Sequence, residues 1–230
     1  LSLSSAHGLR RRVLASLALW PLLSLAALPA QAGVGMTELT AGDLPVTLVY
    51  PSDAPETTLK RGDFELRVAL DGAPAAASAP RRLIVMSHGT GGSAVSDHEM
   101  AATLARAGFV VAQPLHAGDN YKDVSKAGPV SWDTRPQEIS RVIDFMAAHP
   151  VWGPRLQTDR VGVHGMSAGG GTALVMAGAQ WTVLQLARHC MVNADEDFGF
   201  CFTGLTTPER QAERRTVYEG LRGAPEAYLP

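Results

Sequence analysis

The chain lacks the features that would direct it to nucleic acid or hold it in a membrane. Its 20 basic and 22 acidic side chains give a net charge of -2, and no basic stripe is present to neutralise a phosphate backbone. The longest apolar run, residues 13–28, is shorter than the roughly 20 residues that a membrane-spanning helix needs. We therefore expect no nucleic-acid partner and no stable membrane span in the mature protein.

Sequence signatures of nucleotide and metal binding are also lacking. Residues 89–93 are rich in glycine and follow an apolar run, but no lysine stands in the spacing of a phosphate-binding loop. The pattern G-x-G-x-x-G does not occur at the first strand-to-helix turn. Three adjacent acids, Asp195, Glu196 and Asp197, point in different directions and favour a solvated loop over a metal site. We expect neither a cofactor nor a metal ion.

The first 32 residues have the pattern of a secretory signal peptide. Arg10, Arg11 and Arg12 precede the apolar run, and the segment ends in an Ala-x-Ala site at Ala32. We expect cleavage before Gly33 and export to the periplasm or out of the cell, by either the general or the twin-arginine route. A membrane anchor is the alternative, which the short apolar run disfavours.

Cysteine is scarce, with Cys190 and Cys201 as the only two in the chain. Both lie in the part expected to be exported, where an oxidising compartment favours a disulfide between them. Two separate buried thiols are the alternative.

The remaining residues, 33–230, are predicted to form a single α/β domain. The expected strands are residues 44–50, 64–70, 83–86, 109–112 and 160–164. One expected helix opens with a capping box over residues 96–99, and another opens at residues 134–137 and ends at Pro150. We expect the first two strands to pair as an antiparallel edge. The later strands alternate with helices, which predicts a mostly parallel sheet covered by helices on both faces.

The most specific motif follows the last of these strands. Residues Gly165-Met-Ser-Ala-Gly169 match G-x-S-x-G, in which a nucleophile sits on a sharp turn from a strand to a helix. Bulky side chains two residues before or after the nucleophile would prevent that turn from closing. The turn would expose the Ser167 hydroxyl and direct the Ala168 N–H into the site. The helix that follows would favour developing negative charge with its N-terminal end.

A second glycine-rich turn, residues 87–92, follows the first buried strand, and here a family resemblance becomes clear. The chain resembles α/β-hydrolases of the group that contains predicted dienelactone hydrolases and platelet-activating-factor acetylhydrolase-like esterases, over residues 44–204. The motifs that carry the resemblance are Val-Tyr-Pro at 49–51, Ser-His-Gly-Thr-Gly-Gly at 87–92, Pro-Leu-His-Ala-Gly-Asp-Asn at 114–120, Arg-Pro-Gln-Glu-Ile at 135–139, and Asp-Arg-Val-Gly-Val at 159–163 before the serine motif.

The resemblance implies a serine hydrolase that cleaves a carboxylic ester of a small molecule or a lipid. Ser167 would be the nucleophile, and the N–H groups of Thr90 and Ala168 would form the oxyanion hole. Dienelactone hydrolases themselves use cysteine as the nucleophile, so an ordinary ester, with a small acyl group, is expected here rather than a dienelactone. The sequence does not determine the natural ester or the oligomeric state.

The resemblance also implies an acid and a histidine that follow the serine in chain order. The residues after Ser167 contain no run that predicts a buried strand, so we expect the last strands, the acid and the base to be missing from the chain as given. His189 is the only histidine after the serine, in a context that does not favour it as the base. His88 and His116 flank the site and either shape the pocket or are structural. The alternative function is a non-catalytic or truncated hydrolase-like protein without turnover.

Overall fold

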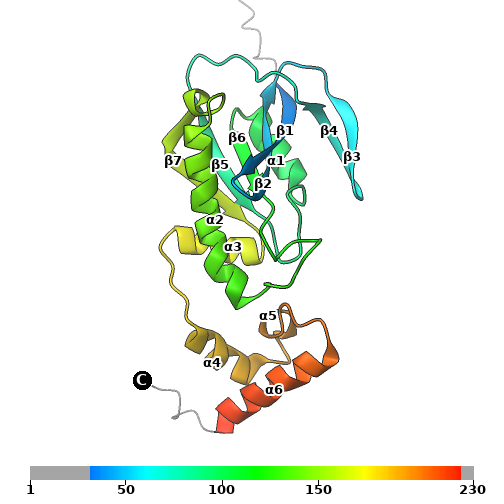
Figure 1. Cartoon of the computed structure of the whole chain (residues 1–230), viewed down its shortest axis with the longest axis vertical. Helices are drawn as coiled ribbons and strands as arrows, with labels where there is room; N and C mark the ends of the chain where they lie inside the picture. The colour runs from blue at the N-terminus through cyan, green and yellow to red at the C-terminus, as the bar shows by residue number, and fades with distance from the viewer. Residues whose placement is uncertain (1–31, 224–230) are drawn as a thin grey trace, which may run out of the picture. The chain divides into compact units, whose positions relative to one another are not determined.

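The computed structural model describes residues 32–223, so the predicted signal peptide lies almost wholly outside the described residues. All elements below belong to the compact unit that begins at Gln31. The strands are β1 Gly33–Ala41, β2 Leu44–Ser52, β3 Thr57–Arg61, β4 Phe64–Leu70, β5 Arg81–Ser87, β6 Val110–Pro114 and β7 Leu156–Gly165. The helices are α1 His98–Arg106, α2 Pro129–Ala148, α3 Ala168–Met176, α4 Val183–Asn193, α5 Phe198–Cys201 and α6 Pro208–Gly223, with a short 3₁₀ turn at Gly153–Arg155 (Figure 1). Of the helices in residues 32–223, none has both the length and the apolar character that crossing a bilayer requires.

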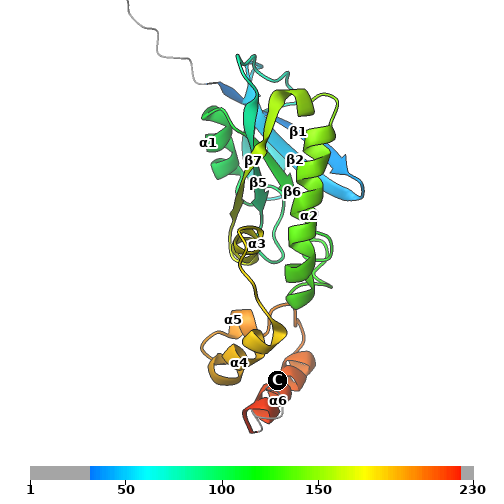
Figure 2. The same ribbon diagram turned by 90° about the vertical axis from the view of Figure 1, so that its left-hand side faces the viewer.

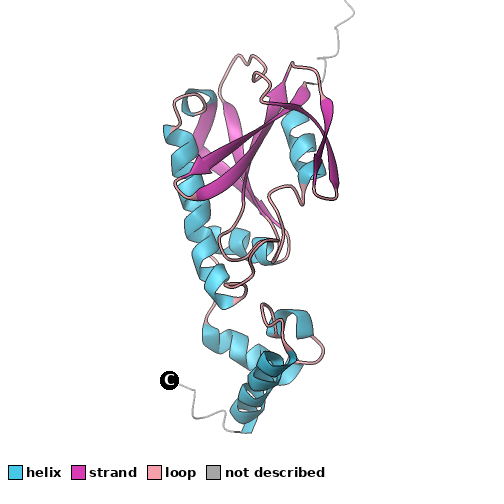
Figure 3. Ribbon diagram, turned by 45° about the vertical axis from the view of Figure 1, so that its right-hand side comes forward, coloured by secondary structure: helices cyan, strands magenta, loops and turns pink. Residues whose placement is uncertain are grey.

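The strands, drawn in magenta in Figure 3, form one mixed sheet. Their order across the sheet is β3-β4-β1-β2-β6-β5-β7. On the β7 side, β6, β5 and β7 are parallel, whereas β2 runs antiparallel to both of its neighbours. Parallel strands bring their carboxyl ends to one edge of the sheet. The turns that follow β5 and β7 therefore lie close together.

The predicted antiparallel pairing of residues 44–50 with 64–70 is wrong. β2 pairs with β1 and β6, and β4 pairs with β3 and in parallel with β1. β1 was not predicted from the sequence; it begins at the expected cleavage site and lies between the two strands. Because β2 has neighbours on both sides, it is buried along almost its whole length, unlike the edge strand that was expected.

Helices cover both faces of the sheet, as expected. Ile139, Val142 and Met146 of α2 pack with β2, β5 and β6 on one face. Ala101 and Ala105 of α1 pack with side chains of the same sheet that point the other way. The edge-on view in Figure 2 shows α1 and α2 on opposite sides of the strands.

Two predicted helix starts are wrong. α1 begins two residues after Ser96, with no side-chain capping bond, because the Ser96 hydroxyl accepts the Ser93 N–H instead, at 2.9 Å. α2 begins five residues before Thr134, with Pro129 in its first turn, where proline is favoured. Pro136, expected at the helix start, lies inside the helix. This earlier start adds between one and two turns to α2, and the added part carries Trp132, which lines the candidate site.

The segment after α3 folds into three helices around the predicted disulfide. Cys190 of α4 and Cys201 of α5 are bonded to each other and buried. They pack with Phe202 and with Tyr218 of α6, whose hydroxyl donates to the Cys201 carbonyl at 2.8 Å. Within residues 32–223, no strand follows β7, in agreement with the sequence analysis. Asp195, Glu196 and Asp197, expected in a loop, lie in the turn between α4 and α5.

Candidate active site

Ser167 lies at the turn between β7 and α3. Its backbone has φ 52° and ψ -120°, a positive-φ conformation that a residue with a side chain adopts only under constraint. Such strain has a free-energy cost of about 1–3 kcal/mol and gathers at functional sites. The side chain is exposed, and α3 begins at the next residue. The conformation is that expected of a nucleophile elbow.

The two glycines of the motif are sterically required in this turn. A β-carbon built on Gly165 would lie 2.0 Å from the Gly169 carbonyl oxygen. One built on Gly169 would lie 1.9 Å from the Ser87 carbonyl oxygen, at the end of β5. Backbone thus packs directly on backbone, so that α3 starts against the end of β5.

The two glycine-rich turns meet at the serine. A β-carbon built on Gly89 would lie 3.5 Å from the β-carbon of Ser167. Thr90, Ser167 and Ala168 line one cavity of about 800 Å³. Among the hydrogen bonds of residues 32–223, none uses the Thr90 or Ala168 N–H as the donor. Two backbone donors that have no acceptor among the described residues therefore accompany the serine hydroxyl at this cavity.

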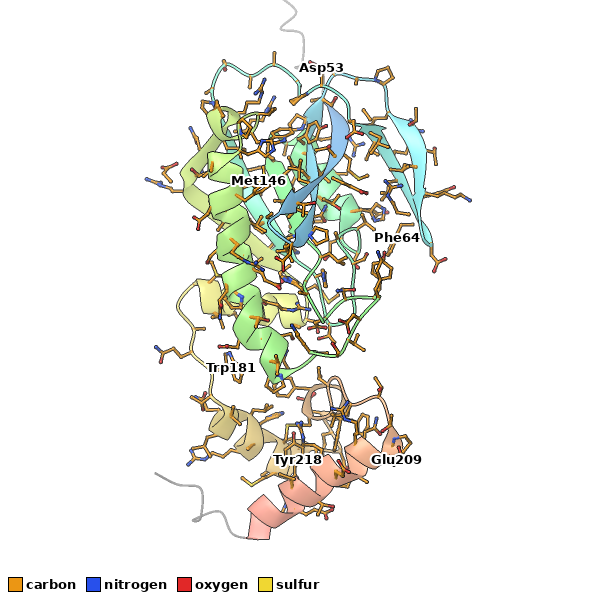
Figure 4. All side chains as sticks on the ribbon, viewed as in Figure 1. Asp53, Phe64, Met146, Trp181, Glu209 and Tyr218 are labelled. Carbon is orange, nitrogen blue, oxygen red and sulfur yellow. A yellow bond between two sulfur atoms is a disulfide. The ribbon has the colours of Figure 1, made fainter. Side chains whose placement is uncertain are left out.

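Aromatic and aliphatic side chains form much of the cavity wall. Trp132 of α2 stacks on Phe200 of α5, with 5.2 Å between the ring centroids, and meets Trp181 edge-on at 5.7 Å. Trp181 lies on the segment between α3 and α4 (Figure 4). Leu174 and Val175 of α3 also line the cavity. This wall suits an apolar group of a ligand.

His189 lines the same cavity, but both of its ring nitrogens are engaged elsewhere. Its Nε2 lies 2.9 Å from Asp197 Oδ2, and its Nδ1 lies 3.3 Å from the side-chain amide nitrogen of Asn193. In the described part of the chain, no hydrogen bond joins His189 to Ser167. In this arrangement, His189 has no nitrogen free to accept the serine proton.

Two of the three adjacent acids, Asp195 and Asp197, are likewise engaged in contacts between side chains. Asp195 accepts a hydrogen bond from Arg215 at 2.7 Å, and Asp197 contacts His189. Within residues 32–223, no group of three His, Cys, Asp or Glu side chains could hold a metal ion.

A buried polar network behind the Gly89 turn contains residues that the sequence analysis did not assign. The Arg135 guanidinium, on α2, forms an ion pair with Asp119 at 2.8 Å, and both side chains are fully buried. Arg135 also donates to the His88 carbonyl at 2.6 Å. Both residues stand in the motifs that carried the family resemblance, but only the folded chain brings α2 against the turn.

His88 and His116 belong to this network, and both are buried. Burial lowers the pKa of His88 to about 4, partly opposed by its hydrogen bond to the Gly89 carbonyl. Burial also lowers the pKa of His116, although its hydrogen bond to Glu138 acts in the opposite direction and raises it. The two imidazoles are therefore neutral at neutral pH.

Ser87, His116 and Glu138 form a hydrogen-bonded chain that is not open to a substrate. Ser87 Oγ lies 2.7 Å from His116 Nε2, and His116 Nδ1 lies 2.6 Å from Glu138 Oε2. Because the carboxylate accepts from Nδ1, the Ser87 hydroxyl donates to Nε2. Ser87 is only 1% exposed, so these three hydrogen-bonded side chains support the end of β5 and do not contact a ligand.

Comparison with known proteins places the chain in a family. The sequence model of the dienelactone hydrolase family matches residues 69–187. A ferulic acid esterase from Streptomyces cinnamoneus superposes with a TM-score of 0.52 and 21% identity, over 66% of this chain and 57% of that one. A dienelactone hydrolase from Anabaena variabilis superposes with a TM-score of 0.41 and 19% identity, over 64% and 58%.

The chain thus spans less than three fifths of the length of either solved protein. No curated protein matches it. The first superposition supports the α/β-hydrolase fold. The family match runs from β4 into α4 and includes both turns that meet at Ser167. Because it covers more than half of the sequence, the chain belongs to the dienelactone hydrolase family.

Proposed function

We propose that the protein hydrolyses carboxylic esters through an acyl-enzyme on Ser167. The observation that carries the proposal is the exposed, strained serine beside two backbone N–H groups, of Thr90 and Ala168, that have no acceptor among the described residues. Donors fixed before the reaction stabilise an oxyanion without reorganising, and one such donor contributes about 10²- to 10³-fold to the rate.

The reaction would proceed in two acyl transfers. Ser167 Oγ attacks the ester carbonyl carbon and loses its proton to a base, and the carbonyl oxygen becomes an oxyanion held by the two N–H groups. Collapse of this tetrahedral intermediate breaks the bond to the alcohol, which leaves with a proton, and forms an ester of Ser167. Water then attacks that ester in the same way and releases the acid.

The base is the group that residues 32–223 do not supply in this arrangement. His189 is engaged by Asp197 and Asn193, and His116 is buried behind β5. We propose that the base and its acid come from outside the described residues. The competing proposal is a non-catalytic hydrolase-like protein, in which Ser167 makes no acyl-enzyme.

The cavity supports a substrate with an apolar acyl group. Its volume of about 800 Å³ exceeds what the expected small acyl group fills, and Trp181, Phe200 and Leu174 line it. An aromatic or alkyl acyl group would bury apolar surface there, at roughly 25 cal/mol per Å². We also propose that the protein acts after export, because the Cys190 to Cys201 disulfide is of a kind that persists in oxidising compartments.

Ester hydrolysis by the protein and by Ser167→Ala tests the proposal. Both are assayed with p-nitrophenyl acetate and p-nitrophenyl butyrate, with and without added imidazole. The open cavity beside Ser167 admits imidazole as an external base. We expect imidazole to raise the rate of the unsubstituted protein well above that of Ser167→Ala, more so with butyrate. Equal rates for the two proteins would favour the non-catalytic alternative, and a fast Ser167-dependent rate without imidazole would show that the chain contains its own base.

A further inference from the structure

We propose that the buried Arg135 guanidinium is a positioning residue for the oxyanion hole, which it serves by fixing the peptide between Gly89 and Thr90. The inference rests on the proposed function, because it concerns the same site. It assigns a role to a side chain that touches neither the cavity nor Ser167.

The direction of the Thr90 N–H follows from that of the Gly89 carbonyl. The residues described contain no cis peptide, and in a trans peptide the C=O and N–H groups point in opposite directions. The Gly89 carbonyl oxygen has three donors: His88 Nδ1 at 2.7 Å, the Gly92 N–H at 3.0 Å and Arg135 Nη2 at 3.4 Å. These donors turn the carbonyl away from the cavity. The Thr90 N–H is thereby turned toward it.

The protonation of His88 is consistent with this arrangement. His88 Nε2 accepts a hydrogen bond from the backbone N–H of His116, with 3.2 Å between the two nitrogens. The neutral His88 ring therefore carries its hydrogen on Nδ1. That hydrogen is donated to the Gly89 carbonyl. Because burial lowers the pKa of His88 to about 4, the neutral form persists at neutral pH.

Arg135 and Asp119 hold the rest of the turn. Arg135 Nη1 donates to the His88 carbonyl at 2.6 Å, and Asp119 Oδ1 accepts the Gly91 N–H at 3.0 Å. Peptide groups on both sides of the Gly89–Thr90 peptide are therefore attached to one ion pair. The hydroxyl of Ser131, on α2, donates to the Asp119 carboxylate at 2.7 Å, which holds this carboxylate against the helix.

A role in stability alone does not account for this ion pair. Desolvation of two fully buried charges often costs more than their attraction returns, and an apolar pair of similar volume would serve packing as well. Arg135 Nε is also buried without a hydrogen-bond partner. Two nitrogens of Arg135 donate to carbonyl groups of the turn. We infer that the ion pair is kept, despite its desolvation cost, because it orients this turn.

The test compares Arg135→Lys with Arg141→Lys on the same helix. Arg141 forms an exposed ion pair with Asp43 and does not touch the turn. Lysine at position 135 keeps the charge beside Asp119 but cannot bind two carbonyls in a fixed fork. With imidazole and p-nitrophenyl butyrate, we expect Arg135→Lys to lower kcat by about 10²-fold, as for loss of one oxyanion donor, with KM changed only slightly. Arg141→Lys should leave both constants unchanged.

Asp119→Asn provides a second variant if Arg135→Lys does not fold. Asparagine keeps the size of the side chain and an acceptor for the Gly91 N–H, but removes the charge that holds the guanidinium. We expect a loss in kcat of about 10-fold or more at an unchanged fold, checked by circular dichroism.

The outcomes separate the two proposals. Normal kcat in folded Arg135→Lys or Asp119→Asn, in a protein whose rate depends on Ser167, would overturn the positioning role and leave the proposed function standing. A decrease that tracks the unfolded fraction would also overturn it. Absence of any Ser167-dependent rate in the unsubstituted protein would overturn both proposals.

Discussion

Replacement of Gly169 by alanine should destabilise the protein, although alanine is the better helix former. A β-carbon at this position would lie 1.9 Å from the Ser87 carbonyl oxygen, whereas real β-carbons essentially never come within 3.0 Å of another atom. α3 and β5 must therefore separate by more than about 1 Å. Forced separation of packed backbone costs about 3 kcal/mol, and the helix propensity of alanine returns about 1 kcal/mol. We expect a net loss of about 2 kcal/mol.

Gly171→Ala provides the matched control on the same helix. A β-carbon on Gly171 meets no atom within 4 Å, so only the helix propensity changes, and a gain of up to about 1 kcal/mol is expected. For a domain of this size, the two changes correspond to a melting temperature lower by about 4–8 °C for Gly169→Ala and higher by up to about 4 °C for Gly171→Ala. Thermal melts of both variants followed by circular dichroism measure the difference. If Gly169→Ala melts at or above the unsubstituted protein, α3 does not start against the end of β5.

Three further predictions concern titration, the disulfide and the candidate base. Because the pKa of His88 is lowered to about 4, the unfolded chain binds a proton below about pH 6.5 that the folded protein does not, so stability falls as the pH drops from 6.5 toward 4. Urea unfolding should show a loss of about 2 kcal/mol from this group between pH 7 and pH 5, and an equal pH dependence in His88→Gln would contradict it. Substitution of both Cys190 and Cys201 by serine should cost about 2–3 kcal/mol, measured by the same unfolding; no change would mean that the bond does not constrain α4 and α5. His189→Ala should leave the imidazole-supported rate within about threefold of the unsubstituted rate, because neither ring nitrogen is free. A Ser167-dependent rate without imidazole that falls by about 10⁴-fold in His189→Ala would identify His189 as the base.

The chemistry-bearing turns could be predicted from the sequence because each is specified locally. The motif around Ser167 needs glycine on both sides for steric reasons, and those contacts are present at Gly165 and Gly169. The strands predicted before the two turns, residues 83–86 and 160–164, lie in β5 and β7. The disulfide between Cys190 and Cys201 was expected because no other cysteine occurs and because export was expected, and the structure contains it.

What the sequence did not reveal depends on contacts between distant segments. β1 has no clear alternation and is a strand because β2 and β4 pair with it on either side. The role of Arg135 cannot be inferred locally, because its ligands, the carbonyls of His88 and Gly89, lie more than 40 residues earlier. The cavity wall likewise combines side chains of α2, α3 and α5. These helices are far apart in the sequence, so no local pattern indicates that they line one cavity.

The central claim is that Ser167 forms a covalent acyl-enzyme at the junction of the two turns. The most direct measurement is to incubate the protein with p-nitrophenyl butyrate and imidazole, quench in acid, digest and locate the acyl group by mass spectrometry. We predict a butyryl group on Ser167, none at this position in Ser167→Ala, and a yield reduced in Arg135→Lys. Butyryl groups found only on lysine side chains, or equally on exposed serines outside the turn, would contradict the account.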